Sequence, residues 1–198
     1  MDKFIVQGGL KLYGKVNIQA AKNAVLPLLA ASILTDERVT IRDLPFISDV
    51  ENMIHILREL GCEAARTGAD IVIDGKNAVS HEIPSTLTKE LRSSVFMLGS
   101  VLTRFHRAKI SYPGGCDIGL RPIDLHLSGL KRLGVTIIEE NGYVICSAEK
   151  IRGADILLDF PSVGATENII LAAVKAEGKT VIGNAAKEPE IIDLQNFL

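Results

Sequence analysis

The chain has 198 residues, of which 47% are hydrophobic, 23% are charged and 5% are aromatic, with no tryptophan. These values are typical of a globular protein, and the low aromatic content means that the core is built mainly from Ile, Leu, Val and Ala. The length is sufficient for one sizeable core or two small ones. The formal net charge is −2, with both signs interspersed. This balance argues against a general nucleic-acid-binding surface, which needs a basic field.

The cysteines and the N-terminal residues restrict the class further. Cys62, Cys116 and Cys146 are odd in number, widely separated and free of a CxxC pair, so neither a disulfide framework nor a zinc knuckle is expected. The first nine residues lack the apolar core of a signal peptide, and no apolar run is long enough to cross a membrane. We therefore expect a cytosolic protein without a membrane partner.

Three stretches of the chain share one plan, in which a helix, a strand and a helix are followed by two strands. The apolar runs of the first helix cover 26–34, 94–102 and 168–174. The strands that follow them end at Ile41, Ile110 and Ile182, which are 69 and 72 residues apart. A period near seventy indicates a tandem-duplicated fold unit rather than a common solenoid.

Within the units, the second helix has the clearest pattern. Its apolar positions recur at helical spacing at Val50, Met53, Ile54, Leu57 and Leu60. Gly61 and Gly134 stand where a helix C-terminal glycine belongs. Alternating or β-branched residues then predict strands at 71–73, 135–138 and 143–145, and a short extended segment at 156–158 precedes the first helix of the third unit.

The third unit reaches Leu198 as its second helix is expected to form, and no strand pair follows. We therefore interpret the chain as a piece of a longer protein or a natural truncation. The alternative is that the third unit differs from the other two.

The segment 113–122, Pro-Gly-Gly-Cys-Asp-Ile-Gly-Leu-Arg-Pro, is the most informative stretch. Three glycines and two prolines exclude the interior of a helix or strand. Cys116 beside a fixed positive charge is a plausible reactive thiol, and Arg121 has the geometry to hold a phosphate or carboxylate in bidentate fashion. The alternative is a glycine-rich turn with an incidental cysteine.

Together with other segments, this stretch resembles the UDP-N-acetylglucosamine 1-carboxyvinyltransferase family of enolpyruvyl transferases. The resemblance runs from Met1 to Leu198, with the segments in the family's order. The segments that carry it, besides 113–122, are Ala-Lys-Asn-Ala-Val-Leu-Pro at 21–27, Leu-Arg-Ser-Ser at 91–94, Pro-Ser-Val-Gly-Ala-Thr-Glu-Asn at 161–168 and Asn-Ala-Ala-Lys-Glu-Pro-Glu at 184–190.

The resemblance implies an α/β (α+β) fold of repeated βαβαββ units around a pseudo-threefold axis, an inside-out α/β barrel. Family members have six such units in two domains, so this chain is expected to be the N-terminal half. Residues 22–198 would form the first domain, with units of about 22–85, 86–153 and an incomplete 154–198. Residues 1–21 would belong to the absent second domain and lack their usual partners, and such an unpaired strand edge invites association or disorder. The face left by the missing domain is a candidate surface for self-association.

The implied reaction transfers the enolpyruvyl group from phosphoenolpyruvate to the 3-hydroxyl of UDP-N-acetylglucosamine, with release of phosphate. This is the first committed step of peptidoglycan synthesis, and so serves cell wall biogenesis, cell shape and cell division. By resemblance, Cys116 is the general acid and the residue alkylated by fosfomycin; a thiol with a pKa of about 8.5 suits that role. No metal, prosthetic group or nucleic acid is implied.

The resemblance assigns substrate contacts to two sets of residues. Lys22 and Asn23 would touch phosphoenolpyruvate, with Lys22 at a helix start that favours anions. Arg121 would grip phosphate and Arg92 would contact the sugar nucleotide. The remaining contacts, to the uridine and diphosphate, are Pro122, Ile123, Asp124, Leu125, Ser162, Val163 and Gly164. For the turn at 162–164 the alternative is a plain helix N-cap, by Ser162 or by Thr166.

Two other readings stay open. A shikimate-pathway enolpyruvyl transferase shares the unit architecture, although it does not use a thiol acid. A non-catalytic fragment that binds a UDP-sugar or dimerises is the second alternative. Because the family's catalytic aspartate comes from the missing half, we expect the isolated chain to be inactive. His126 is close to the Arg121 segment, and a helix-surface position is expected for it; the alternative is a place in the lining of the nucleotide pocket.

Overall fold

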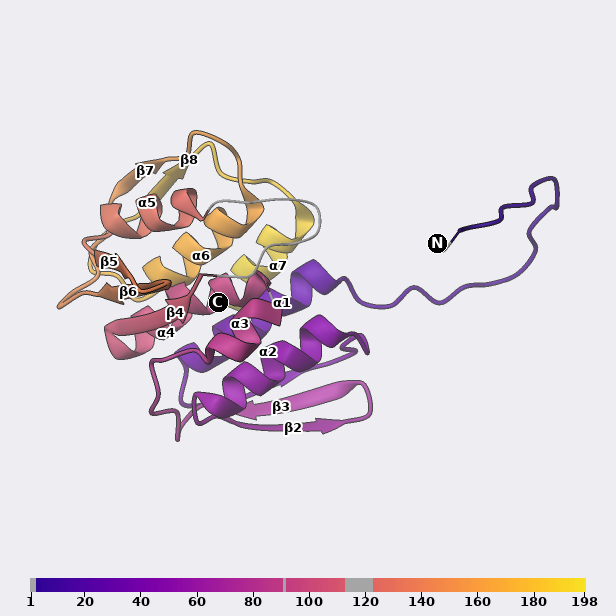
Figure 1. Ribbon diagram of the computed structural model, residues 1–198, viewed down its shortest axis with the longest axis horizontal. Coiled ribbons are helices and arrows are strands. Elements are labelled where there is room, and N and C mark those ends of the chain that lie inside the picture. The colour runs from indigo at the N-terminus through magenta and orange to yellow at the C-terminus, as the bar shows by residue number, and fades with distance from the viewer. Residues whose placement is uncertain (1–2, 91, 113–122) are drawn as a thin grey trace.

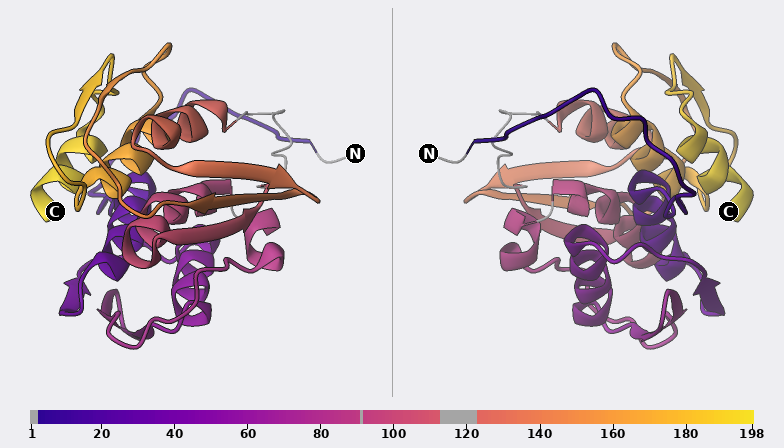
Figure 2. Two further views of the ribbon diagram at one scale, coloured as in Figure 1. Left: turned by 90° about the vertical axis from the view of Figure 1, so that its left-hand side faces the viewer. Right: turned by 90° about the vertical axis from the view of Figure 1, so that its right-hand side faces the viewer.

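The computed structural model describes residues 3–90, 92–112 and 123–198 (Figure 1). From Lys22 onward they form three units of helices and strands around buried helices, with the sheets on the outside. The sheet of the second unit faces the viewer in the left panel of Figure 2. The expected α/β repeat is therefore confirmed.

The first unit contains two long helices and a three-stranded antiparallel sheet. Its elements are α1 (Lys22–Ala31), the 3₁₀ helix η1 (Ser32–Leu34), β1 (Arg38–Ile41), α2 (Ser48–Glu59), β2 (Glu63–Thr67) and β3 (Asp70–Asp74). The strand order is β1-β3-β2. All five apolar positions predicted on α2 and its C-terminal end are buried, as its helical spacing requires.

The second unit repeats this arrangement after a short helix, α3 (Ser85–Glu90). Its elements are η2 (Arg92–Val95), α4 (Phe96–Phe105), β4 (Arg107–Ser111), α5 (Asp124–Arg132), β5 (Thr136–Glu140) and β6 (Tyr143–Ser147), with the strand order β4-β6-β5. Gly61 and Gly134 have φ values of +98° and +87°. Both follow a helix in the left-handed conformation that glycine adopts without strain, as predicted.

The third unit contains two helices and two short strands. They are β7 (Asp155–Leu157), α6 (Val163–Ala173), β8 (Val181–Gly183) and α7 (Pro189–Phe197). The β7 and β8 strands are parallel. The predicted second helix of this unit is thus present over nine residues, and Leu194 on it is fully buried.

The helices α1, α4 and α6 run in the same direction through the core. Gly99 N donates to Asn168 Oδ1 at 2.7 Å, and one turn later Thr103 Oγ1 donates to Leu171 O at 3.1 Å. Contacts that advance together along both helices show that α4 and α6 are parallel. Near the C-terminal end of α4, Arg104 Nη1 donates to Ile33 O at 3.0 Å, just after the C-terminal end of α1. The C-terminal ends of α1 and α4 therefore lie together.

The N-terminal residues 3–21 form no helix or strand, and all of them are exposed. In Figure 1 they extend away from the body of the molecule. Eight large apolar side chains lie on this segment: Phe4, Ile5, Val6, Leu10, Leu12, Tyr13, Val16 and Ile18. No helix in the described part of the chain is long and apolar enough to cross a membrane.

Candidate functional site

The N-terminal ends of the three inner helices lie at the same end of the molecule, because the helices are parallel. Lys22 is the first residue of α1, Arg92 the first of η2, which leads into α4, and Val163 the first of α6. Each helix N-terminus presents free N–H groups and the positive end of a dipole. The arrangement gathers three anion-favouring ends from segments far apart in the sequence.

Lys22 and Asn23 occupy the first turn of α1. The Lys22 ammonium pairs with the carboxylate of Asp49, in the first turn of α2, and remains about half exposed. Asn23 is exposed. The helix start predicted at Lys22 is therefore confirmed, and its charge is held at the end of the bundle where the other helices begin.

The start of α5 adjoins the start of α6. Ile123 is the buried N-cap of α5, Asp124 is exposed and Leu125 is half-buried. His126 is only 8% exposed, so the expected surface position is wrong. Its ring lies so close to Gly164 that a Cβ there would stand 3.2 Å from His126 Cε1. Gly164 thus permits the two helix starts to approach.

The first turn of α6 is held by its own side chains. Ser162 is the N-cap, and its Oγ accepts a hydrogen bond from Ala165 N at 3.3 Å. The plain N-cap interpretation of Ser162 is therefore confirmed. Val163 and Gly164 are half-buried behind it. Thr166 Oγ1 donates to Ser162 O at 2.8 Å and accepts from Ala186 N at 3.0 Å, which ties this turn to the segment before α7.

Glu167 adds an acidic group to this end of α6. Its side chain is 1% exposed, and Oε1 has no hydrogen-bond partner among the described residues. The pKa of Glu167 is raised to about 8, chiefly by burial and to a smaller extent by the negative charges of Glu190 and Glu188. At neutral pH the carboxyl is mostly protonated, so it does not add a full negative charge to the anion-favouring end.

Glu167 was not predicted as part of this region, and for His126 a place in the nucleotide pocket was only the alternative to a helix-surface position. Their burial depends on contacts with α5, α6 and α7, which come from distant segments. A signal was present in the run Thr166-Glu167-Asn168, because three consecutive polar residues interrupt an otherwise apolar helix.

Several predicted site residues lie outside the described structure. Cys116, Arg121 and Pro122 belong to segment 113–122, whose described neighbours are Tyr112 and Ile123. The two described cysteines are both buried: burial raises the pKa of Cys62 to about 11 and that of Cys146 to about 12. Within the described ranges, no cluster of His, Cys, Asp and Glu has the composition of a metal site.

Comparison with protein families finds one matching family model, that of EPSP synthase (3-phosphoshikimate 1-carboxyvinyltransferase), over residues 6–198. Among curated proteins, the chain is 54% identical over 198 residues to UDP-N-acetylglucosamine 1-carboxyvinyltransferase 2 of Caldanaerobacter subterraneus. It is 48% identical over 199 residues to UDP-N-acetylglucosamine 1-carboxyvinyltransferase of Escherichia fergusonii. All of this chain is covered in both cases, against 48% and 47% of the relatives. The chain thus spans about half the length of the curated relatives it matches.

Solved structures show a similar fold. The enolpyruvyl transferase NikO from Streptomyces tendae has a TM-score of 0.83 at 22% sequence identity, over 96% of this chain and 45% of NikO. EPSP synthase from Acinetobacter baumannii has a TM-score of 0.67 at 17% identity, over 90% of this chain and 42% of that protein. At such low identity the likeness concerns the fold alone.

Proposed function

This chain belongs to the EPSP synthase family of enolpyruvyl transferases, and we propose that it forms the first domain of an enzyme acting on UDP-N-acetylglucosamine. The reaction transfers the enolpyruvyl group of phosphoenolpyruvate to the 3-hydroxyl of the sugar and releases phosphate, the first committed step of peptidoglycan synthesis. Relatives of about 50% identity carry the name of this activity. The observation that carries the proposal is the common end of α1, α4 and α6, beside the start of α5.

The proposed reaction has two balanced steps. In the addition, the sugar hydroxyl oxygen bonds to C2 of phosphoenolpyruvate, a proton is delivered to the C3 methylene, and the hydroxyl loses its own proton to a base. In the elimination, the C3 methyl gives up a proton, the bond between C2 and the phosphate oxygen breaks, and phosphate leaves. Both steps need one group that first donates and then accepts a proton at C3.

We assign that group to Cys116, following the match of segment 113–122 with the family. A thiol is mostly protonated at neutral pH, and a neighbouring cation lowers its pKa enough for it to exchange a proton readily. Arg121 supplies such a cation in the same segment and is assigned to the phosphate. Pro122 is assigned to the uridine contact.

The described residues support roles in binding. Lys22 stands at a helix N-terminus, so its ammonium and the helix dipole both favour the carboxylate and phosphate of phosphoenolpyruvate. Asn23 is exposed beside it. At the start of α6, the free N–H groups of Val163 and Gly164 suit a diphosphate, in the manner of a helix-terminal anion site. We assign the sugar-nucleotide contact to Arg92.

The start of α5 completes the proposed nucleotide pocket. Ile123, Asp124 and Leu125 lie next to α6 through the contact of His126 with Gly164. This proximity is what the assigned uridine contact requires, because one nucleotide must reach both the α5 start and the diphosphate-binding turn of α6.

A mass-spectrometric experiment tests the proposal. The chain is treated with fosfomycin, with and without UDP-N-acetylglucosamine, and its intact mass and the adduct position are determined. We expect an adduct at Cys116 that forms faster with the sugar nucleotide, and none in Cys116→Ser. Failure of fosfomycin to label Cys116, while a general thiol reagent still modifies it, would contradict a site formed by this chain.

A second experiment tests activity. We expect no phosphate release by the chain alone, and release after a separately expressed C-terminal half of a relative is added. Saturable sugar-nucleotide binding without turnover in the mixture would favour a non-catalytic UDP-sugar-binding fragment. Turnover by the chain alone would overturn the assignment of part of the site to another domain.

A further inference from the structure

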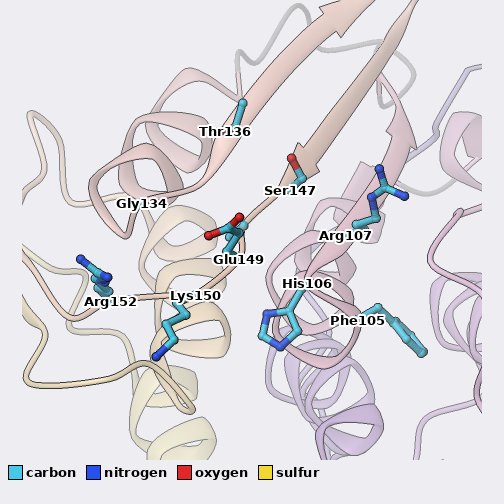
Figure 3. Close-up of a pocket in the computed structure, with 10 residues that line it drawn as sticks. Phe105, His106, Arg107, Gly134, Thr136, Ser147, Glu149, Lys150 and Arg152 are labelled. Carbon is cyan, nitrogen blue, oxygen red and sulfur yellow. The ribbon is translucent and has the colours of Figure 1, made fainter.

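A cavity of about 650 Å³ lies at the end of the β4–β6–β5 sheet where β4 begins (Figure 3). The candidate active site, at the common N-terminal end of α1, α4 and α6, lies at the other end of this unit. Helix α4 starts at that site, and its last residue, Phe105, lines the cavity. Ten helical residues span about 15 Å, so the two regions are separate. The volume lies in the range of small-molecule sites.

The cavity is rich in cations and hydroxyl groups. Its charged lining residues are Arg107, Lys150, Arg152 and Glu149, and its hydroxyl side chains are Thr136 and Ser147. Lys150 Nζ forms an ion pair with Glu177 Oε1 at 2.9 Å. The pKa of Glu177 is lowered chiefly by Lys150, and the positive charge of Arg152 lowers it as well. Among the described residues, the Arg107 guanidinium has no carboxylate partner.

The first unit has an equivalent sheet, and its residues can be compared with those that line the cavity. We call the three directly opposite residues at this end of a sheet, one on each strand, a row. There Arg38, Asp74 and Glu63 lie directly opposite one another across β1, β3 and β2. Arg38 Nε donates to Asp74 Oδ2 at 3.2 Å, and Glu63 Oε1 accepts from Asn77 Nδ2 at 3.3 Å. The cation of this row is therefore neutralised within the row.

In the second unit the same row consists of Arg107, Ser147 and Thr136, with identical register. Directly opposite residues point to the same face of a sheet, so the guanidinium and the two hydroxyl groups share the outer face. Both carboxylates of the first row have been replaced by hydroxyl groups. The arginine is kept without the acid that neutralises its counterpart.

The next positions along the chain change in the same direction. Ser147 is followed at three and five residues by Lys150 and Arg152, and Asp74 at the same spacings by Asn77 and Val79. One change opposes the trend, because Glu149 stands where the first unit has Lys76. Counting Glu177, three cations face two carboxylates.

We propose that this cavity binds a phosphate-type oxyanion, carried by a small phosphorylated molecule or free in solution. A guanidinium fork matches two phosphate oxygens, and the Thr136 and Ser147 hydroxyl groups donate to the others. Lys150 and Arg152 also line the cavity and add further positive charge. The inference does not depend on the proposed function, because none of these residues belongs to the candidate active site.

An NMR titration of the ¹⁵N-labelled chain at low salt tests the proposal, with inorganic phosphate and ribose 5-phosphate as separate probes. We expect saturable shifts of the Arg107, Thr136 and Ser147 amides, separate from any at Lys22 and Ser162. Tighter binding of ribose 5-phosphate identifies a phosphate ester as the ligand, and equal or tighter binding of inorganic phosphate identifies the free ion. Shifts confined to the Lys22 and Ser162 region would overturn the proposal.

The internal repeat supplies matched variants. Ser147→Asp recreates the first-unit row and should weaken the affinity at least tenfold by neutralising Arg107. Glu149→Gln removes a competing carboxylate and should strengthen it. The reciprocal variant Asp74→Ser frees Arg38 and should create weak anion binding in the first unit. Affinity unchanged by Ser147→Asp would contradict the proposal; if that variant fails to fold, Arg107→Gln provides the same test.

Discussion

Asn168 on α6 and His126 on α5 are joined by a buried hydrogen bond, with Asn168 Nδ2 lying 3.1 Å from His126 Nδ1. Since the amide nitrogen donates, His126 Nδ1 accepts and the ring carries its proton on Nε2. The amide oxygen of Asn168 accepts from Gly99 N at 2.7 Å. One side chain therefore connects α4, α5 and α6 just behind the candidate active site.

Replacing Asn168 should destabilise the fold. Asn168→Ala removes both hydrogen bonds from a fully buried position and should lower the free energy of unfolding by about 2–3 kcal/mol. Urea unfolding followed by circular dichroism measures the change. Asn196→Ala, at an exposed position on α7, is the control and should cost less than about 0.5 kcal/mol. Equal stabilities of the two variants would show that the Asn168 contacts contribute little.

The close approach of α4 and α6 depends on Gly99. A Cβ at this position would stand 2.4 Å from Asn168 O and 3.2 Å from Ala172 N, both backbone atoms of the facing helix. Gly99→Ala should therefore destabilise the chain by about 1–3 kcal/mol, despite the higher helix propensity of alanine. Gly8→Ala, whose Cβ meets nothing within 4 Å, should leave the unfolding midpoint unchanged. A stabilised Gly99→Ala variant would mean that the helices can separate without cost.

Much of the fold was predictable because the strongest signals are local. The helical spacing on α2 and the glycines that end α2 and α5 were interpreted correctly. Two strands were expected after α2, but only β3 was located; the residues of β2 (Glu63–Thr67) were not, since they carry little of the β-branched character that marks β3. Its place is set by pairing with β3, which is a tertiary property.

The candidate site was only partly predictable, for a similar reason. The helix starts at Lys22 and Ser162 carry local signals, whereas the burial of His126 arises from packing against α6. No spacing rule within α5 indicates that contact. The roles proposed for Cys116 and Arg121 rest on resemblance, and they remain predictions.

Glu167 should make stability depend on pH. In the unfolded chain a glutamate titrates near about 4.3, whereas burial raises the pKa of Glu167 to about 8 in the fold. Between these values the folded state binds more protons than the unfolded state, so stability falls as pH rises. Glu167→Gln should lose less stability than the wild-type chain between pH 5 and pH 8.5, by up to a few kcal/mol at about 1.4 kcal/mol per pKa unit.

The comparison needs urea unfolding at both pH values and one control. Glu177→Gln removes an exposed carboxylate whose pKa is lowered by Lys150. The Glu177 carboxylate loses its contribution to stability only when pH falls through its lowered pKa, which is below the range of pH 5 to pH 8.5. The stability of Glu177→Gln should therefore change with pH as that of the wild-type chain does. Parallel slopes for all three proteins would show that Glu167 is not held protonated by the fold.

The buried thiols should be unreactive in the native chain. Burial raises the pKa values of Cys62 and Cys146 to about 11 and 12, so their thiolate fraction at neutral pH is very small. Cys116→Ser should therefore contain no rapidly reacting thiol until denaturant is added. The measurement is colorimetric labelling with a disulfide reagent, and rapid modification of Cys62 or Cys146 in the folded variant would contradict the structure.

Removing residues 1–18 should leave the stability of the chain nearly unchanged. All described residues of this segment are exposed, so deletion removes no packed contact and should change the free energy of unfolding by less than about 0.5 kcal/mol. Leu194→Ala, at a fully buried position of α7, provides the contrast and should cost about 2–5 kcal/mol. A deletion as costly as Leu194→Ala would show that the segment packs on the body of the molecule. If stability is unchanged and sedimentation reveals less self-association after deletion, the exposed apolar side chains of the segment mediate contacts between molecules rather than support the fold.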